Sequence, residues 1–188
     1  MKKLLVLLVV GLLAVTSLTG CAAPKTYKFG TGSSTTVSAK AAVAAVAATK
    51  DTAADEAAPG QVQVTSVYAA VLLDDAGKIV YVDIDSAQNK GTFDAAGAVV
   101  KAEAAPTKTE KAGDYGMKGA SAIGKEWFEQ AAGLEAYLVG KTAAEVEAIE
   151  IDGEGVAVAE DLKTSISVGI DEYLAAFAKA VANAVEVK

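Results

Sequence analysis

The sequence lacks histidine and arginine entirely and contains a single cysteine among its 188 residues. Without histidine, the chain has neither the commonest general base nor the commonest transition-metal ligand. Ser–His–Asp and Cys–His catalytic sites, ordinary zinc sites, histidine-ligated haem and cysteine-held iron–sulfur clusters therefore cannot be assembled from this chain alone. A redox or group-transfer function would consequently need a bound cofactor.

Acidic residues outnumber basic ones. The chain has 24 Asp and Glu against 17 Lys, which gives a formal charge of −7 and a pI near 4.7. The lysines are scattered rather than clustered. Binding to nucleic acid requires clustered Lys or Arg to neutralise phosphates, so this function class is excluded. The length suits one ordinary domain after a leader is removed.

The N-terminal residues have the pattern of an export signal. Lys2 and Lys3 precede an apolar run over residues 4–15, which is short for a membrane span, and Leu-Thr-Gly-Cys follows at residues 18–21. This ending resembles the lipobox of bacterial lipoproteins, which implies cleavage before Cys21 and attachment of lipid to its thiol. The alternative is an ordinary cleaved signal with an unmodified cysteine near the cut.

With lipid on Cys21, the chain divides into three parts. We expect residues 1–20 to be the signal peptide, residues 21–26 a lipid-anchored spacer and residues 27–188 the folded domain. The domain would then be extracytoplasmic and anchored through its lipid to the outer face of the cell membrane.

The first part of the domain is predicted to be mostly β-structure. Residues 27–39 mix Gly, Ser, Thr and β-formers, as in a strand bent by glycine. The Ala-rich stretch that follows is predicted to continue this strand and then to form a loop ending at Pro59–Gly60. Alternating apolar residues from Val62 and from Ile79 flank Asp-Asp-Ala-Gly, which predicts a β-hairpin. A similar turn at residues 94–97 predicts two more strands.

The second half is predicted to be helical around a glycine-rich segment. This segment, residues 108–124, holds four glycines and is predicted to be a loop of the length that often binds ligands. Amphipathic helices are predicted over residues 125–139 and from Ile170 to Val185, and Thr142 begins a short helix with a capping box. We therefore expect an α+β fold, an antiparallel sheet of hairpins packed by two or three helices in a single domain.

A cluster of hydroxyl side chains precedes the last predicted helix. In Asp-Leu-Lys-Thr-Ser-Ile-Ser, residues 161–167, three of the last four side chains are hydroxyls. The free N–H groups of a helix's first turn attract anions, and the glycine two residues later would let a phosphate approach. The alternative is helix capping by Ser167 or Asp171, with Thr164 and Ser165 as turn residues.

The same residues resemble the attachment motif of the FMN-binding domain found in bacterial flavoproteins and cell-surface electron-transfer lipoproteins. In that family, Asp-x-x-(Ser/Thr)-(Gly/Ser)-Ala-(Ser/Thr) precedes the C-terminal helix, and its last hydroxyl can carry FMN through a phosphoester bond. The resemblance implies that Ser167 is the attachment oxygen. Ile166 stands where the motif has alanine, and serine replaces the more usual threonine at position 167. The turn would be shaped by Asp161, Thr164, Ser165 and Gly169.

A further resemblance covers residues 61–186. The sequences Gly-Asp-Tyr-Gly-Met-Lys, Gly-Lys-Glu-Trp and Val-Gly-Lys-Thr-Ala-Ala-Glu-Val are similar to those of uncharacterised FMN-binding-like lipoproteins of Gram-positive bacteria. An isoalloxazine ring needs an aromatic or thioether surface, with a cation or backbone N–H near its polar edge. The candidates for such a flavin wall are Tyr115, Met117, Lys118 and Trp127. The alternative is that the two aromatic residues pack the segment onto the sheet.

These patterns predict an FMN carrier in extracytoplasmic electron transfer rather than an enzyme with its own substrate pocket. The family resemblance implies a membrane dehydrogenase as electron donor and a flavin transferase that attaches the cofactor. One alternative is a flavin-free envelope lipoprotein that binds a small ligand or a protein; another is that the cleaved leader is the active product.

Paired acids such as Asp74 and Asp75 lie in turns or on exposed strand faces, so no metal site is expected.

Overall fold

The computed structural model describes residues 25–50 and 56–187, so Cys21 and the predicted signal peptide lie outside the described residues. Within this part of the chain, five strands form one antiparallel sheet in the order β4-β3-β2-β1-β5. The strands are β1 (Tyr27–Lys40), β2 (Gly60–Leu73), β3 (Ile79–Phe93), β4 (Val99–Glu103) and β5 (Val185–Val187). The helices are α2 (Lys108–Lys111), the 3-10 helix η1 (Ala112–Tyr115), α3 (Trp127–Leu138), α4 (Ala143–Glu147), α5 (Glu160–Lys163) and α6 (Asp171–Ala182).

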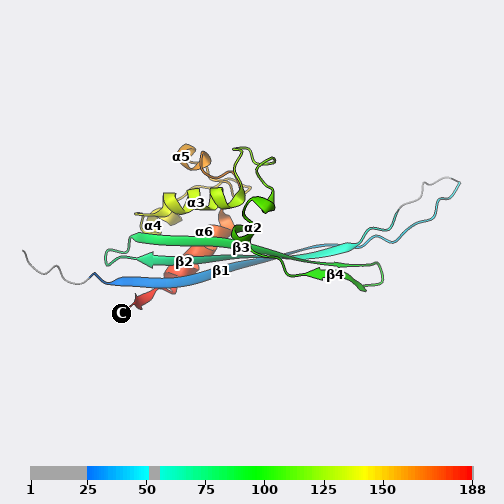
Figure 1. Ribbon diagram of the computed structural model, residues 1–188, viewed down its shortest axis with the longest axis horizontal. Coiled ribbons are helices and arrows are strands. Elements are labelled where there is room, and N and C mark those ends of the chain that lie inside the picture. Colours follow the sequence, from blue (N-terminus) through cyan, green and yellow to red (C-terminus); the bar gives the residue numbers. More distant parts are fainter. Residues whose placement is uncertain (1–24, 51–55, 188) are drawn as a thin grey trace, which may run out of the picture.

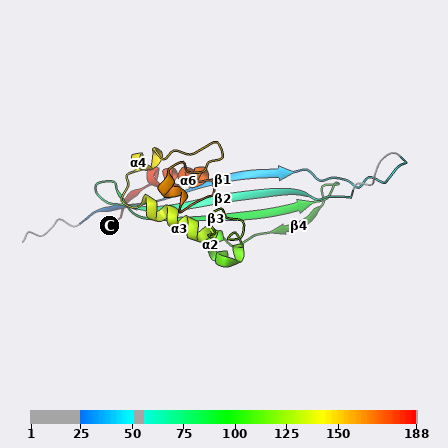
Figure 2. The same ribbon diagram turned by 90° about the horizontal axis from the view of Figure 1, so that it is seen from above.

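The helices cover one face of one half of the sheet (Figure 1). α6 packs on β1 and β2, and α3 packs along β3, as the view from above shows (Figure 2). The other half of the sheet, with β4 and the chain that joins β1 to β2, extends beyond the helices. The expected α+β fold, an antiparallel sheet of hairpins packed by helices, is confirmed.

The core lies between the covered half of the sheet and the two longer helices. Alternate residues of β2 and β3 point toward the helices, as the two-residue period of a strand requires. The helices contribute residues at helical spacing, among them the predicted stripe of α3. Buried members of the core include Val67, Val71, Ile79, Ile84, Trp127, Ala131, Leu134, Leu138, Ile166, Ile170 and Phe177.

Two glycines let α6 lie directly on β1. Gly30 and Gly32 point toward the helix. A Cβ atom on Gly30 would lie 2.1 Å from the carbonyl oxygen of Ala180, and one on Gly32 would lie 2.3 Å from that of Ala176. No side chain fits at such distances, because the atoms approached belong to the helix backbone. These glycines therefore set how closely the last helix, and the loop that precedes it, approach the sheet.

Beyond the helices, the strands reverse their pattern of polarity. Gln61 and Gln63 lie on the side of the sheet that would face a helix, and Val62 lies on the opposite side, where it is 37% exposed. Polar side chains suit this side because none of the described helices covers it there. The Gln-Val-Gln-Val alternation therefore predicts the strand correctly but does not indicate which of its faces is buried.

Three tight turns share one geometry. In each, an aspartate carboxylate accepts hydrogen bonds from the backbone N–H groups two and four residues later, and a glycine with positive φ completes the turn. The turns begin at Asp74, Asp94 and Asp152. The first two confirm the predicted hairpin turns, and the third closes the bridge between Ile151 and Ala157.

Hydrogen bonds join the helical layer to the edge of β3. The Ile84 N–H donates to Glu135 Oε1 at 2.8 Å, and the Thr109 N–H donates to Asp85 Oδ1 at 3.2 Å. Burial raises the pKa of Glu135, the Ile84 N–H opposes this rise, and the charges of Asp83 and Asp85 add to it. The ionised Glu135 carboxylate is therefore unfavourable in the folded protein.

We expect Glu135→Gln to stabilise the protein at neutral pH. A folded-state pKa above the unfolded one means that Glu135 carries no penalty at low pH and that stability is lost as pH rises through the folded pKa. Glutamine keeps an oxygen for the Ile84 N–H without the charge, and solvent screens this half-buried site, so the variant should gain only about 0.5 kcal/mol at neutral pH and very little near pH 4. Urea unfolding at both pH values measures the difference. As a control, Glu135→Ala loses the acceptor and should be less stable than the parent at both.

Three observed elements differ from the predicted ones. The last helix ends at Ala182 rather than Val185, because the backbone of Val185–Val187 pairs with the edge of β1 as β5. Residues 91–93 continue β3 and pair with β2, so the second hairpin adds β4 alone to the described sheet. The glycine-rich segment is not wholly a loop, since a capping box at Thr107 starts α2, which leads into η1.

Candidate functional site

Residues 164–169, here named the hydroxyl loop, connect α5 to α6. The N–H groups of Ser165 and Ile166 both donate to the Leu162 carbonyl at 2.9 Å. The Ile166 side chain is fully buried in the core, whereas Ser167, the next residue, is half-buried. The bulk of Ile166 therefore lies on the inner side of the loop, so the branched residue that replaces the motif alanine does not cover the Ser167 hydroxyl.

The first turn of α6 is already supplied with negative charge. The helix begins at Asp171, one residue after the predicted start, and no side chain caps it by a hydrogen bond, so Ser167 is not a helix cap. Its first turn contains Asp171 and Glu172, and the Glu172 carboxylate accepts a hydrogen bond from the Ser34 hydroxyl. These carboxylates balance the positive end of the helix dipole. The structure thus argues against a phosphate bound at the N-terminus of α6 itself.

A buried glutamine on α3 holds Ser167 in place. The Gln130 side-chain oxygen accepts hydrogen bonds from the Ser167 N–H at 2.8 Å and from the Ser167 hydroxyl at 3.3 Å. The Gln130 amide nitrogen donates to the Ser121 hydroxyl at 2.9 Å and to the Lys125 carbonyl at 3.2 Å. Since Gln130 is fully buried, these four bonds satisfy and orient its amide. They also tie the hydroxyl loop to the glycine-rich segment.

One helical turn earlier, Glu126 holds two of the predicted contact residues by their backbone. Its carboxylate accepts hydrogen bonds from the Met117 N–H at 2.9 Å and the Lys118 N–H at 3.1 Å. Glu126 is the N-cap of α3, and its own N–H donates to Glu129 in a capping box. Residues four apart lie on the same side of a helix, so Met117, Lys118 and Ser167 all meet α3 near its N-terminal end.

Trp127, a candidate for the flavin wall, lies in the core. It is 1% exposed, its ring N–H donates to the Tyr173 hydroxyl at 2.8 Å, and the two rings meet edge to face with centroids 5.9 Å apart. The Lys108 ammonium lies 5.2 Å from the Trp127 ring centre and 5.1 Å from that of Tyr115. Burial lowers the pKa of Lys108 to about 8 and raises that of Tyr173 to about 12. Trp127 is therefore a packing residue that presents no open ring face.

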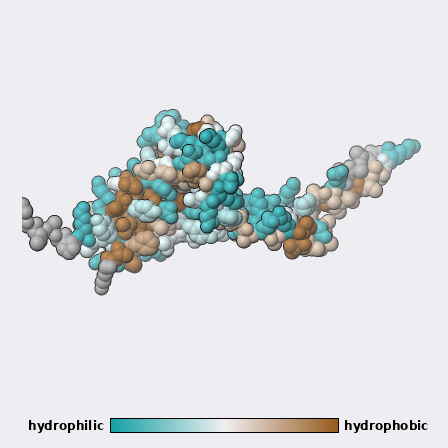
Figure 3. Space-filling view, in the orientation of Figure 1, coloured by the Kyte–Doolittle hydropathy of each residue, from teal (hydrophilic) through white to brown (hydrophobic). Residues whose placement is uncertain are grey.

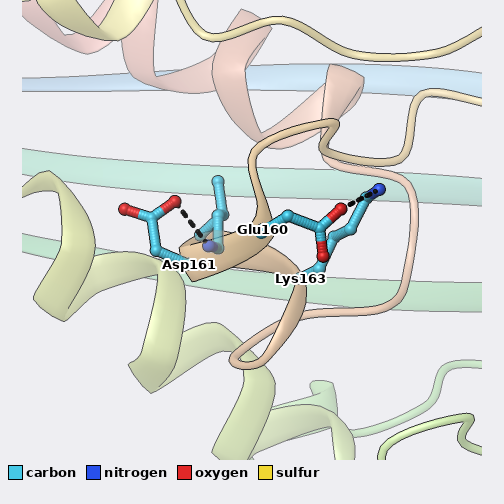
Figure 4. Close-up of polar contacts among 4 residues, drawn as sticks. Glu160, Asp161 and Lys163 are labelled. Atoms are coloured by element: carbon cyan, nitrogen blue, oxygen red, sulfur yellow. Dashed lines mark hydrogen bonds and ion pairs between the residues drawn. The ribbon is translucent and has the colours of Figure 1, made fainter.

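Asp161 and Thr164 make local contacts at α5. The Asp161 carboxylate accepts a hydrogen bond from the Leu162 N–H at 2.9 Å, and the Thr164 hydroxyl donates to the Asp161 carbonyl at 2.8 Å. Figure 4 shows the Asp161 carboxylate pointing away from the ion pair of Glu160 and Lys163, whose charged atoms are 3.0 Å apart. These contacts shape the turn that leads into the hydroxyl loop.

Sequence reasoning misses four residues of this arrangement, namely Ser121, Lys125, Glu126 and Gln130. The Lys125 ammonium donates to the Thr164 carbonyl at 3.2 Å, which brings a cation to the hydroxyl loop. Gln130 carries a recognisable signal, because it lies at helical spacing within the apolar stripe that begins at Trp127. The other three have no local signal, since the loop and helix that they join meet only in the folded chain.

None of the described cavities is lined by Ser167, and two of them are relevant to function. One, of about 700 Å³, spans the face of the sheet opposite the helices, where it is lined by residues that include Tyr68, Asp83 and Asp85 together with the end of α6. The other, of about 390 Å³, is an apolar groove between α4 and α6.

In the ranges that the structure describes, no three Cys, Asp or Glu side chains are grouped to bind a metal ion. None of the described helices is long and apolar enough to cross a bilayer.

A chlorophenol reductase of Desulfitobacterium hafniense is similar to part of this chain. The two are 37% identical over 94 aligned residues, and the match covers 42% of this chain. It covers 28% of the reductase, so this chain spans little more than a quarter of that protein's length. No model of a known protein family matches the chain, and no solved structure matches it.

Proposed function

We propose that the chain is a lipid-anchored FMN carrier that holds the flavin through the Ser167 hydroxyl and transfers electrons at the outer face of the cell membrane. The observation that carries the proposal is the contact of Ser167 with the buried Gln130. A hydroxyl that donates a hydrogen bond to a fixed acceptor has its oxygen lone pairs directed away from that acceptor, where they can form a bond to phosphorus. Bound FMN would supply the one- and two-electron chemistry that the side chains of this protein lack.

The residues near Ser167 suit a phosphate ester. The Lys125 ammonium reaches the hydroxyl loop, where it is available to a phosphate, and Lys118 is an exposed second lysine whose backbone is held at the same end of α3. Met117 is half-buried beside Lys118 and offers a thioether surface to a flavin ring. Trp127 is predicted by the sequence to contact the flavin ring. In this proposal it packs in the core instead and supports α3.

The resemblance to FMN-binding domains supplies the partners of the proposed carrier. It implies a membrane dehydrogenase as electron donor and a flavin transferase as the enzyme that attaches FMN. The Ser167 oxygen would form its bond to phosphorus by breaking the phosphoanhydride bond of a flavin dinucleotide, which releases the nucleoside monophosphate, and the hydroxyl proton would pass to solvent. The partial similarity to a protein named as a reductase supports a redox setting for this chain. Lipid on Cys21 would keep the carrier beside its membrane donor.

We expect the chain to become a yellow protein when it is co-expressed with a flavin transferase. Intact mass should increase by one FMN moiety, and the absorbance spectrum should contain the two visible bands of a flavin. Ser167→Ala should abolish both changes, because it removes the attachment oxygen and leaves the buried contacts of the loop backbone. The measurements are an absorbance spectrum and an intact mass for each variant.

The matched control is Ser165→Ala, which removes a hydroxyl from the same loop while retaining the Cβ that packs against Gly133. This variant should remain yellow and carry the full added mass. A colourless parent protein that binds no added FMN would falsify the carrier function. Equal loss of flavin in both variants would show that the loop, rather than the Ser167 oxygen, is what attachment requires.

A second function is favoured by the position of the 700 Å³ cavity. That cavity lies across the open face of the sheet, away from Ser167, and contains an exposed Tyr68 beside Asp83 and Asp85. A flavin-free lipoprotein that binds a small ligand would use this surface. Native mass spectrometry of the colourless protein should then detect a bound ligand, and Tyr68→Ala should release it.

A further inference from the structure

The open face of the sheet carries an apolar patch at the end where β1 begins. This patch, here named the near-end patch, consists of residues from four strands, namely Tyr27, Phe29, Leu72, Tyr81, Val185 and Val187. Four of these side chains are strongly exposed, from 42% for Phe29 to 67% for Val185. Figure 3 shows hydrophobic residues gathered at this end of the molecule. Apolar side chains in a contiguous exposed group mark a surface of interaction.

The strand register places all six side chains on the same face. Tyr27 pairs with Val187, and Phe29 pairs with both Val185 and Leu72. Leu72 in turn pairs with Tyr81. Directly paired residues point to one side of a sheet, as do residues two apart in one strand. This side is opposite Gly30, whose own side faces α6, so none of the described helices covers the patch.

The patch ends abruptly along the strands. The next residues on the same face are Thr31, Ala70 and Asp83, and after them come Ser33, Tyr68 and Asp85. Four of these six side chains are aliphatic hydroxyls or carboxylates, as is usual on a sheet face in contact with water. Polar residues therefore separate the near-end patch from the exposed valines farther along the same face, among them Val37 at 65% exposure.

The position of the patch near Cys21 indicates what the patch contacts. Cys21 precedes Tyr27 by six residues, which span at most about 20 Å even when fully extended. β1 itself runs for about 45 Å at the usual rise per residue, so its far end can stand well away from an anchor on Cys21. The near end is thus the part of the sheet that must stay within about 20 Å of a membrane that holds this cysteine.

We propose that the near-end patch lies against the surface of the lipid bilayer. This end of the sheet would then contact the membrane. The inference rests on the proposed anchoring at Cys21 for the choice of occupant. Tyrosine and other amphipathic side chains favour the interface between headgroups and acyl chains. Charges of both signs, Lys25 and Lys28 with Asp74 and Asp75, lie at this end, so apolar contact rather than charge drives the association.

The test uses the full chain on vesicles of neutral phosphatidylcholine that contain acyl-chain quenchers. A fluorophore is attached at Tyr81→Cys in one variant and, as the matched control, at Val99→Cys on β4 in another. Both positions are exposed, 56% and 75%, so neither change disturbs the core. Wild-type chain treated with the same reagent measures any reaction at Cys21. Flotation of the vesicles separately measures whether the chain is anchored.

We expect the label at position 81 to be quenched about threefold more strongly than the label at position 99. If the chain floats with the vesicles but the two labels are quenched equally, or not at all, the proposed contact of the patch with the bilayer is wrong, although the chain is anchored. A chain that does not float overturns both. A label at position 81 that is already shielded without vesicles, together with a doubled mass in analytical ultracentrifugation, would instead identify the patch as a surface between two copies of the chain.

Discussion

Replacing Gly32 with alanine is expected to lower the free energy of unfolding by about 3 kcal/mol, because one methyl group would force α6 away from the sheet. A Cβ at this position would lie 2.3 Å from the Ala176 carbonyl oxygen and 2.4 Å from the Ala180 nitrogen. Both are backbone atoms, so no side-chain rotation relieves the contact. Urea unfolding followed by the fluorescence of Trp127 measures the loss, and thermal unfolding should show a fall of roughly 6–12 °C.

The matched control for Gly32→Ala is Gly91→Ala on β3. A Cβ there would meet its nearest neighbour, the Lys101 carbonyl oxygen, at 3.9 Å, which is an ordinary contact. This variant should unfold within about 0.5 kcal/mol of the parent. If Gly32→Ala were as stable as Gly91→Ala, the close packing of α6 on β1 would be refuted. The double variant Gly30→Ala with Gly32→Ala should lose cooperative unfolding altogether.

Replacing Gln130 with leucine is expected to weaken both the fold and the attachment of flavin. Leucine fits the volume of glutamine but leaves the Ser167 N–H and the Lys125 carbonyl without their partners, which costs about 2–4 kcal/mol in total. Ser167 would also lose the acceptor for its hydroxyl proton, so the yield of flavinylated protein should fall about tenfold if the transition state for attachment loses a comparable hydrogen bond. Unfolding curves and intact mass of the co-expressed protein measure the two effects.

Gln130→Glu separates these two effects. The carboxylate keeps an oxygen for Ser167 but cannot donate to Ser121 or Lys125, and it places a charge at a buried position. We expect it to destabilise the fold at least as much as leucine does while retaining more flavin per folded molecule. Should flavin yield merely follow stability in both variants, Gln130 would act only on the fold and not on the hydroxyl of Ser167.

Local patterns in the sequence account for most of the elements. The Asp-x-x-Gly turns at Asp74 and Asp94, the capping box at Thr142 and the apolar stripe of α3 all depend on residues within a few positions of each other. Such interactions form in the same way whatever the rest of the chain does. The end of α6 was not predictable in this manner, because Val185 leaves the helical stripe to pair with β1, which is far away in the sequence.

The candidate site was predictable only in part. The motif identifies Ser167 and the residues before it, since they are consecutive in the chain. Its surroundings depend on contacts over long separations, such as the bonds from Gln130 to Ser121 and to Ser167. Trp127 is a residue that the sequence wrongly suggests for the site. Its chemistry suits a flavin wall, but it is buried against Tyr173 and is not at the surface.

The sequence by itself determined the α+β class, the hairpin turns and the chemistry that is excluded by the absence of histidine and arginine. It determined these because composition and short-range hydrogen bonding do not depend on tertiary contacts. Only the tertiary structure decided that Ile166 points inward, that Gln130 orients Ser167, and that one end of the open sheet face is apolar. Each of these depends on which side of a strand or loop faces a distant element, and the alternation of residues does not carry that information.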